Sequence, residues 1–301
     1  MQYSILITTK NRLSQLQLTL KKIENFINRD DVECLIYDDG SNDNTFKTIK
    51  ASYPEIKLLK NLKSKGLIYC RNILLSKTKA KYAITIDDDS HVVNLEAIAK
   101  VPLYFKDNKD CAVLGCRIFW GLSLPKNTTT NEISLRVKSF VGCGHIWNME
   151  KWQLIPKYPE WFKFYGEEEF AAFQLFKVGL QVHYFPEILV HHRVDVKSRK
   201  KQKDYALRTR RALRAGWYLY LLFYPLNLVV KRIVYSIFMQ FKLKVLKGDF
   251  VVAISILQGL GDVLVNFSRL LKNSNRLTKV EFKEFSNLPD TKIYWKPNSL
   301  K

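Results

Sequence analysis

Segments with the character of β-strands and of α-helices alternate over the first 106 residues, and this alternation restricts the chain to few folds. Apolar runs of strand length are separated by stretches whose apolar residues recur at helical spacing. Strands that alternate with helices in this way form a mostly parallel, doubly wound α/β sheet with right-handed crossovers. The predicted strands are 3–9, 32–37, 55–60 and 81–86, and the predicted helices are 13–27, 44–52, 66–77 and 95–106.

The fourth predicted strand ends in three consecutive carboxylates, Asp87, Asp88 and Asp89. In an open parallel sheet, ligands bind outside the carboxyl ends of the strands. Three adjacent carboxylates repel one another, and a divalent cation with oxygen ligands, such as Mg²⁺ or Mn²⁺, would hold them ionised. For the triplet alone, a solvated acidic turn that caps the next helix is the alternative interpretation.

Other charged residues follow the first three predicted strands and can lie at the same edge of the sheet. Asp39 can accept hydrogen bonds from a nucleobase or a ribose, and Arg71 or Lys10 can hold a nucleotide or its diphosphate. The sequence has neither a Walker A motif nor GxGxxG, so a nucleotide would depend on such side chains.

The pattern changes after Cys111, and the mixed segment that follows is typical of a second substrate site. Trp161 belongs to an aromatic group that either stacks on an acceptor sugar or packs in the core. Gly144 lies in a glycine turn that could let the backbone approach a sugar. The expected elements are a strand over 111–119, a loop over 120–133, short strands within 134–149, a helix opened by Glu167, Glu168 and Glu169, and a strand over 180–192 that ends in His191 and His192.

The C-terminal third carries much of the formal charge of +21. Residues 197–214 contain nine Lys or Arg and one acid, and the uncharged run 215–230 is too short for the ~20 residues of a membrane span. Amphipathic helices predicted over 216–246 and 249–272 next to this basic cluster are typical of an anionic membrane surface. A helical subdomain that packs on the core is the alternative. Residues 273–301 are expected to form a loosely ordered polar tail.

A nucleic-acid-binding function is less consistent with the composition. A nucleic-acid binder would interleave basic residues with stacking aromatics, whereas this basic cluster adjoins long apolar helices, so we expect no nucleic-acid partner.

The five cysteines lack CxxC or zinc spacing and are expected to be reduced and buried. The first residues have no secretory signal pattern, which favours a cytoplasmic location.

A series of motifs in this order resembles glycosyltransferase family 2, the inverting nucleotide-sugar enzymes of GT-A fold. The resemblance covers residues 3 to about 195. The motifs are Ile5 to Arg12, Tyr37 to Thr45, Gly66 with Arg71 and Asn72, Asp87 to Asp89, Gly166 to Glu168 with Gly179 eleven residues later, and Pro186 leading to His191 and His192.

The resemblance implies roles for individual residues. Asp39 would bind the nucleobase, Asp87 and Asp89 would bind the ribose and the metal, and His192 would complete the metal site, with His191 as the alternative. The acidic pair Glu167 and Glu168 would supply the catalytic base, which we expect to be Glu168, with Glu167 and Glu169 as alternatives. The expected donor-nucleotide residues are Thr8, Lys10, Asp39, Arg71, Asp87 and Asp88.

These expectations combine into one hypothesis. Residues 1–195 form a GT-A catalytic domain (nucleotide-binding half 1–110, acceptor-side half 111–195), 196–272 a membrane-association region and 273–301 a tail. The enzyme would move a sugar from a UDP- or dTDP-sugar to a glycan hydroxyl, most readily a lipid-linked one, in surface-polysaccharide synthesis at the inner face of the cell membrane. The alternative is a catalytically silent sugar-nucleotide binding protein.

Overall fold

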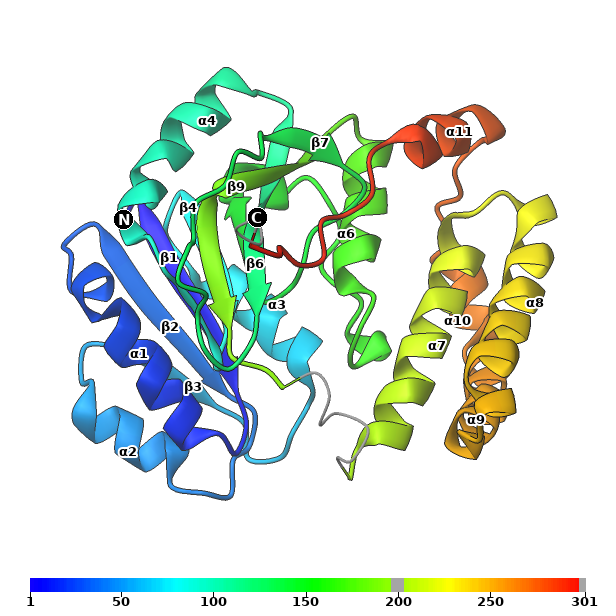
Figure 1. Cartoon of the computed structure of the whole chain (residues 1–301), viewed down its shortest axis with the longest axis horizontal. Coiled ribbons are helices and arrows are strands. Elements are labelled where there is room, and N and C mark those ends of the chain that lie inside the picture. Colours follow the sequence, from blue (N-terminus) through cyan, green and yellow to red (C-terminus); the bar gives the residue numbers. More distant parts are fainter. Residues whose placement is uncertain (196–202, 298–301) are drawn as a thin grey trace.

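The first part of the chain forms the predicted alternation of strands and helices (Figure 1). The computed structural model describes residues 1–195 and 203–297. The elements are β1 Tyr3–Thr9, α1 Leu13–Ile27, β2 Val32–Asp38, α2 Thr45–Ser52, β3 Lys57–Lys60, α3 Leu67–Lys77, β4 Tyr82–Asp87 and β5 Ser90–Val92, followed by a 3₁₀ turn at Leu95–Lys100 and α4 Val101–Asp107. The predicted α/β class is therefore confirmed.

The described strands form one mixed sheet of nine strands in the order β3-β2-β1-β4-β8-β6-β9-β5, with β7 paired to β9. Strands β1 to β4 pair in parallel, whereas β8 runs antiparallel between β4 and β6. Because β8 is antiparallel, it begins beside the carboxyl end of β4, where Gly144 pairs with Ile86. The further elements are β6 Cys111–Trp120, β7 Leu135–Val137, β8 Gly144–Asn148, α5 Met149–Trp152, α6 Glu167–Lys177 and β9 Gln181–His192.

Helices cover both faces of the sheet, and each face has its own apolar core. One core joins the sheet to α1 and α4 through side chains such as Leu20 and Phe105. The other joins it to α3 and α6 and extends to the C-terminal helices through Phe223. The five cysteines are free and buried, as predicted.

The C-terminal region is a group of helices, and the first and the last of them pack on the catalytic core (Figure 1). The predicted helix over 216–246 does not form as one helix. Instead the first helix begins at Tyr205, within the basic cluster, and ends at Phe223, because Pro225 holds Tyr224 in an extended conformation. The helices are α7 Tyr205–Phe223, α8 Leu226–Leu243, α9 Phe250–Val265, α10 Phe267–Lys272 and α11 Lys279–Asn287.

Residues 273–297 differ from the expected loosely ordered tail. Thr278 and Glu281 form a capping box that starts α11, and Phe285 of this helix stacks on Phe173 of α6. Further on, Trp295 is buried against β6. The expectation of a loosely ordered tail rested on the polar average composition of this segment, in which these few buried apolar residues have little weight.

Within residues 1–195 and 203–297, no helix has both the length and the apolar character needed to cross a bilayer.

Phe223 tests whether α7 is part of the catalytic core. Its ring is fully buried and stacks on Phe173 at a centroid distance of 4.7 Å. We expect Phe223→Ala to lower the free energy of unfolding by about 3–5 kcal/mol, measured by denaturant titration. The matched control is Phe238→Ala on the exposed face of α8, which should change it by less than about 0.5 kcal/mol. Equal effects of the two substitutions would contradict this arrangement.

Candidate active site

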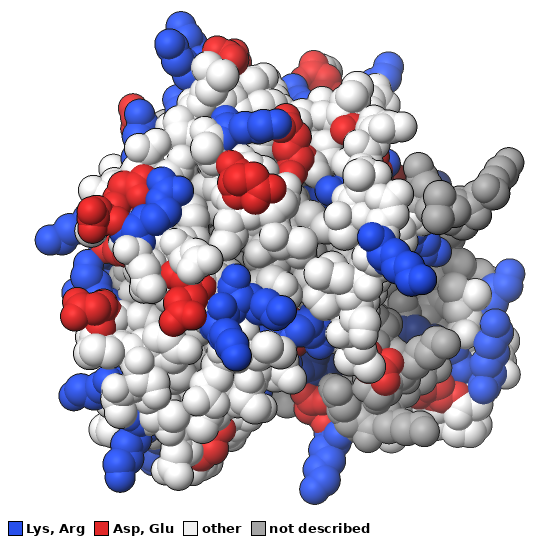
Figure 2. Space-filling model, turned by 60° about the vertical axis from the view of Figure 1, so that its left-hand side comes forward, with Lys and Arg blue, Asp and Glu red and all other residues white. Residues whose placement is uncertain are grey.

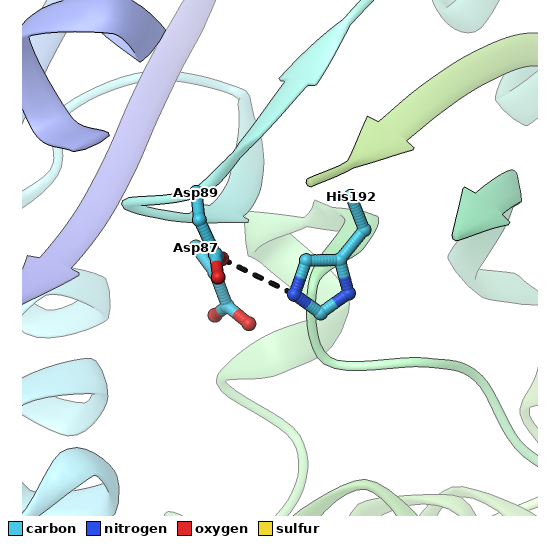
Figure 3. A group of neighbouring side chains, drawn as sticks. All are labelled: Asp87, Asp89 and His192. Atoms are coloured by element: carbon cyan, nitrogen blue, oxygen red, sulfur yellow. Dashed lines mark ion pairs between the residues drawn. The ribbon is translucent and has the colours of Figure 1, made fainter. Parts of the chain in front are cut away.

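Two carboxylates and one imidazole meet at the carboxyl end of β4 (Figure 3). One potential ligand atom from each of Asp87, Asp89 and His192 lies within 4.8 Å of the others. His192 Nε2 is 3.1 Å from Asp89 Oδ1, and both side chains are buried. The sequence analysis predicted each of these three residues for the donor and metal site, and the structure brings them together.

Strand pairing explains how residues so distant in sequence converge. The chain turns after Asp89 into β5, which pairs antiparallel with the end of β9 so that Ser90 lies opposite His192. The same turn is tied to the β8 loop, because Ser90 Oγ donates a hydrogen bond to the Cys143 carbonyl at 2.9 Å. His191, the alternative ligand, instead places its ring nitrogen 2.7 Å from the Gly121 carbonyl.

Charge favours the ionised form of Asp89. Burial alone would raise the pKa of this carboxyl, but the hydrogen bond and charge of His192, together with Arg12, lower it to about 2. Arg12 Nη2 is 2.5 Å from Asp89 Oδ2. Asp89 therefore stays negative at neutral pH and attracts a cation.

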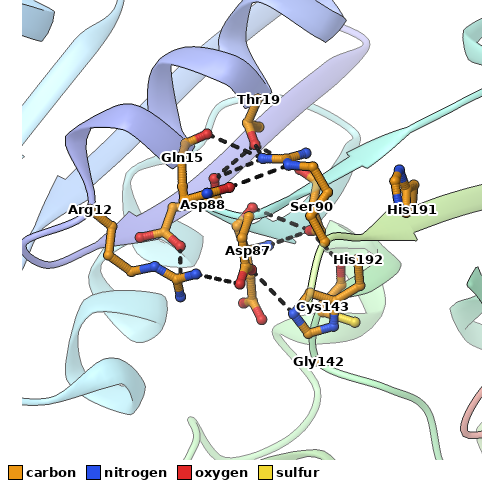
Figure 4. Close-up of polar contacts among 12 residues, drawn as sticks. Arg12, Gln15, Thr19, Asp87, Asp88, Ser90, Gly142, Cys143, His191 and His192 are labelled. Atoms are coloured by element: carbon orange, nitrogen blue, oxygen red, sulfur yellow. Dashed lines mark hydrogen bonds and ion pairs between the residues drawn. The ribbon is translucent and has the colours of Figure 1, made fainter. Parts of the chain in front are cut away.

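Asp88 is not part of the metal-binding triad, and its carboxylate contacts Arg12 and β1 (Figure 4). Its carboxylate accepts a hydrogen bond from Thr9 at 2.8 Å and lies 3.3 Å from Arg12, and its carbonyl accepts one from Thr19 at 2.7 Å. Burial, together with Asp89, raises the pKa of Asp88 to about 7 against the effect of Arg12. Asp88 therefore fixes the end of β4 to β1 and α1. A contact between Asp88 and the donor nucleotide stays a prediction.

Arg71 is the link between the triad and the acidic helix start. Its guanidinium is 97% buried and lies 2.9 Å from Asp87, 2.8 Å from Glu167 and 3.3 Å from Glu168. It also donates to the Gly142 carbonyl at 3.0 Å. The sequence analysis expected Arg71 to hold a nucleotide, whereas in the structure its hydrogen bonds go to protein carboxylates, so the nucleotide contact stays a prediction.

The three glutamates at the start of α6 differ in accessibility. The side chain of Glu167 is 2% exposed and that of Glu168 is 17% exposed, whereas Glu169 lies on the exposed side of the helix. Burial raises the pKa of both Glu167 and Glu168, and Arg71 opposes the shift. Glu168 is thus the carboxylate that is close to the triad through Arg71 and still open to a substrate.

Gly142 lies against two side chains of the site, Glu168 and Arg71, whereas the sequence alone placed it only within a glycine turn. A Cβ atom at this residue would lie 2.0 Å from Glu168 Oε1 and 2.7 Å from Arg71 Nη1. A side chain here would therefore displace both groups. Gly144, the predicted acceptor-side glycine, lies inside β8, where a Cβ would meet Ile118 and Val190, so its acceptor contact stays a prediction.

Asp39 is close to the site but already fully hydrogen-bonded. One carboxylate oxygen accepts from the Asn61 side chain and the Lys65 amide, and the other accepts from Ser64 Oγ and the Gly66 amide, at 2.6–2.9 Å. Burial alone would raise the pKa of Asp39, but these hydrogen bonds lower it. Asp39 organises the loop before α3, and its nucleobase contact stays a prediction.

Three other predicted residues lie around this region in different settings. Thr8 is buried at the end of β1, and Lys10, next to it, is exposed. Trp161 packs on Tyr218 of α7 at a ring distance of 5.0 Å and lies under the Arg269 guanidinium. No contact among the described residues tests a donor role of Thr8 and Lys10 or an acceptor role of Trp161.

Arg12 and Trp120 also belong to this site, and the sequence indicated them weakly or not at all. Arg12 was visible only as one of two basic residues after the first strand. Trp120 ends β6 with its ring edge-on to His192 at 5.7 Å. No local spacing predicts this contact, because it depends on the pairing of β6 with β9.

The donor set fits a hard divalent cation. Carboxylate oxygens with one imidazole suit Mg²⁺ or Mn²⁺ better than soft metals, and the Cys143 thiol beside His192 has its pKa raised by burial. Asp87, Asp89 and His192 are the residues that could hold such an ion.

The fold is that of a GT-A glycosyltransferase, and solved structures with this fold resemble the chain. TarS of S. aureus aligns with a TM-score of 0.53 at 15% identity, over 73% of this chain and 40% of that chain. GalNAc-T7, solved with UDP, GalNAc and Mn²⁺, aligns with a TM-score of 0.61 at 13% identity, over 89% and 57%. The chain thus spans less than two thirds of these two proteins. The mannosyltransferase PcManGT of Pyrobaculum calidifontis, in complex with GDP-Man and Mn²⁺, aligns with a TM-score of 0.56 at 11% identity, over 95% and 83%.

The family is shown by the sequence itself. The model of glycosyl transferase family 2 matches residues 4–172, which is more than half of the chain. The protein therefore belongs to glycosyltransferase family 2. No curated protein matches the sequence.

Gly142→Ala tests the close approach at the site. The added methyl group must push Glu168 and Arg71 apart, and a displacement of about 1 Å can cost about 100-fold in rate, so we expect a loss of this size in sugar transfer. The control is Gly216→Ala in α7, where no atom lies within 4 Å of the new Cβ. Both variants should keep the far-UV circular dichroism of the wild type. Normal turnover in Gly142→Ala would contradict this geometry.

Proposed function

We propose that the protein is an inverting glycosyltransferase that moves a sugar from a nucleoside-diphosphate-sugar to a hydroxyl of a lipid-linked glycan during surface-polysaccharide synthesis. The observation that carries the proposal is the connected set of charges in which Arg71 joins Asp87 of the metal-binding triad to Glu168. This set places a donor-side acid and an accessible carboxylate on either side of one guanidinium.

The roles follow from accessibility and charge. Glu168 is the base that accepts the proton of the acceptor hydroxyl, because Glu167 is enclosed by Arg71 and Glu169 faces solvent. One base and a single displacement invert the anomeric centre. A Mg²⁺ or Mn²⁺ held by Asp89 and His192, with Asp87 beside it, would neutralise the charge that develops on the leaving diphosphate.

The donor is a nucleotide sugar, and UDP- or dTDP-sugars are favoured. Asp39 at the end of β2 is compatible with a uracil or thymine partner. TarS has been solved with UDP-GlcNAc and GalNAc-T7 with UDP, whereas PcManGT has been solved with GDP-Man. The base is therefore best identified by direct comparison of UDP-, dTDP- and GDP-sugars.

A peripheral position on an anionic membrane accounts for the outer surface of the C-terminal helices. Apolar side chains that recur every three or four residues form one face of a helix. On α8 and α9 such apolar faces point to solvent instead of the core. They consist of Leu226, Val230, Val234, Phe238 and Phe241 on α8, and of Phe250, Ile254, Leu257 and Leu264 on α9.

The charges that accompany this apolar surface lie mainly on α8. Of the predicted basic cluster, residues 197–201 lie outside the described residues, and Arg208, Arg210 and Arg214 form ion pairs with Asp204 or Asp262. Exposed basic residues follow on α8 and its end: Lys231, Arg232, Lys242 and Lys247. On the face in Figure 2, by contrast, Lys and Arg are spread among acidic residues, with one group beside a recess near the middle of the view. Cations next to exposed apolar residues favour a lipid surface over water.

Glu168→Gln tests the proposed base. The amide cannot accept the acceptor proton, so transfer should fall by about 10²–10⁴-fold while UDP binding by calorimetry is kept. The matched control is Glu169→Gln, one residue away on the exposed side of α6, which should transfer sugar normally. Unchanged turnover in Glu168→Gln would remove this residue from its role. A wild-type chain that binds UDP but turns over no UDP-, dTDP- or GDP-sugar would favour a silent binding protein.

Vesicle binding tests the membrane proposal with the fold intact. The triple variant Val234→Asp, Phe238→Asp and Ile254→Asp should bind phosphatidylglycerol vesicles at least about 1,000-fold more weakly in sedimentation, because each of the three apolar side chains lost from the lipid contributes about 1.5–3 kcal/mol. The control carries the same change at three exposed apolar residues of the catalytic domain, namely Leu62, Leu103 and Ile133. Equal sedimentation of both variants, or a wild type that forms a dimer and ignores vesicles, would contradict the proposal.

A further inference from the structure

The C-terminal segment returns from the helices to the catalytic sheet. After α11 the chain runs back across the molecule toward β6, as the red segment in Figure 1 shows. The Pro289 carbonyl accepts a hydrogen bond from the Lys138 amide at 3.0 Å, and the Trp295 amide donates to the Ile118 carbonyl at 2.5 Å. Residues 289–297 are therefore attached to the sheet at two points, and we call them the return segment.

Trp295 is the anchor of the return segment. Its side chain is 7% exposed, and the Arg117 guanidinium lies over its ring at 4.4 Å. Arg117 is itself buried and donates hydrogen bonds to the carbonyls of Pro186 and Thr128, both at 2.9 Å. Burial of an aromatic ring against a guanidinium that is already fixed holds this segment in one position.

The residue before the anchor reaches the metal-binding triad through one intermediate ring. Tyr294 stacks on Trp120 at a centroid distance of 6.0 Å and an interplanar angle of 26°. Trp120 in turn lies edge-on to His192 at 5.7 Å and 88°. His192 is the imidazole that lies 3.1 Å from Asp89. A continuous line of ring contacts thus joins the return segment to the metal-binding side chains.

We propose that Tyr294 is a positioning residue that holds Trp120 against His192 and so fixes the imidazole for divalent metal binding. The contacts around a metal-binding histidine set its ring orientation, and their loss typically weakens metal affinity. Tyr294 covers one face of the Trp120 ring, so that removal of the Tyr294 ring weakens the packing that keeps Trp120 edge-on to His192. The inference rests on the metal site of the proposed function but not on the base, the acceptor or the membrane.

The test measures Mn²⁺ affinity of the full chain by the electron paramagnetic resonance of the free ion, first alone and then with UDP added. Tyr294→Ala should weaken Mn²⁺ binding by about 10-fold, in the lower part of the range for such partners of a metal ligand. Trp295→Ala, which removes the anchor, should give a similar loss. Tyr294→Phe keeps the ring and should restore binding to within about twofold of the wild type.

The matched control is Tyr235→Ala, which removes an equally exposed tyrosine from α8 and should leave Mn²⁺ affinity unchanged. Wild-type affinity in Tyr294→Ala would overturn the positioning role and leave the metal site standing. A wild type that binds no Mn²⁺ under either condition would overturn both the metal site and this inference. Loss of sugar transfer in Glu168→Gln is independent of either result, because that variant tests the base alone.

Discussion

The enclosure of one guanidinium by three carboxylates is the constraint on which the site depends. Arg71 is buried, so its charge requires partners, and it finds them in Asp87 on β4 and in Glu167 and Glu168 on α6. Removal of Arg71 would leave these three carboxylates, of which Glu167 is fully buried, without their shared counter-charge. The network therefore fixes the start of α6 relative to the end of β4. A base on α6 can reach an acceptor hydroxyl only if it is held in a fixed position relative to the donor site at β4.

The side chains around Arg71 and Arg12 carry more negative than positive charge. Five carboxylates (Asp87, Asp88, Asp89, Glu167 and Glu168) lie against the guanidinium groups of Arg12 and Arg71. Burial relieves part of this excess, because it raises the pKa of Asp88 and of Glu167 toward their neutral forms. Asp89, whose pKa is lowered, stays charged. A divalent cation between Asp89 and His192 would offset what remains.

Much of this arrangement could be predicted from local pattern, and the rest depended on long-range pairing. Strand and helix periods located the elements from β1 to α4 except the short strand β5, which was not predicted, and the acids after β4 were placed correctly because strand ends share one edge. The partners of Arg71 could not be predicted, since they require β8 and α6 to be in place. The order of residues 273–297 was missed for a related reason: Phe285 and Trp295 are isolated apolar residues whose partners lie on α6 and β6.

Helix α7 gives the C-terminal region a fixed relation to the site. One side of α7 places Tyr218 and Phe223 in the catalytic core, and the other places Leu213 and Trp217 in a separate apolar cluster with α9. Arg214 of this helix donates a hydrogen bond to the Phe162 carbonyl, just before the acidic start of α6. A surface that held α8 and α9 would therefore hold the catalytic domain through one continuous packed helix. The orientation of the site toward that surface would follow from core packing and would not require a flexible linker.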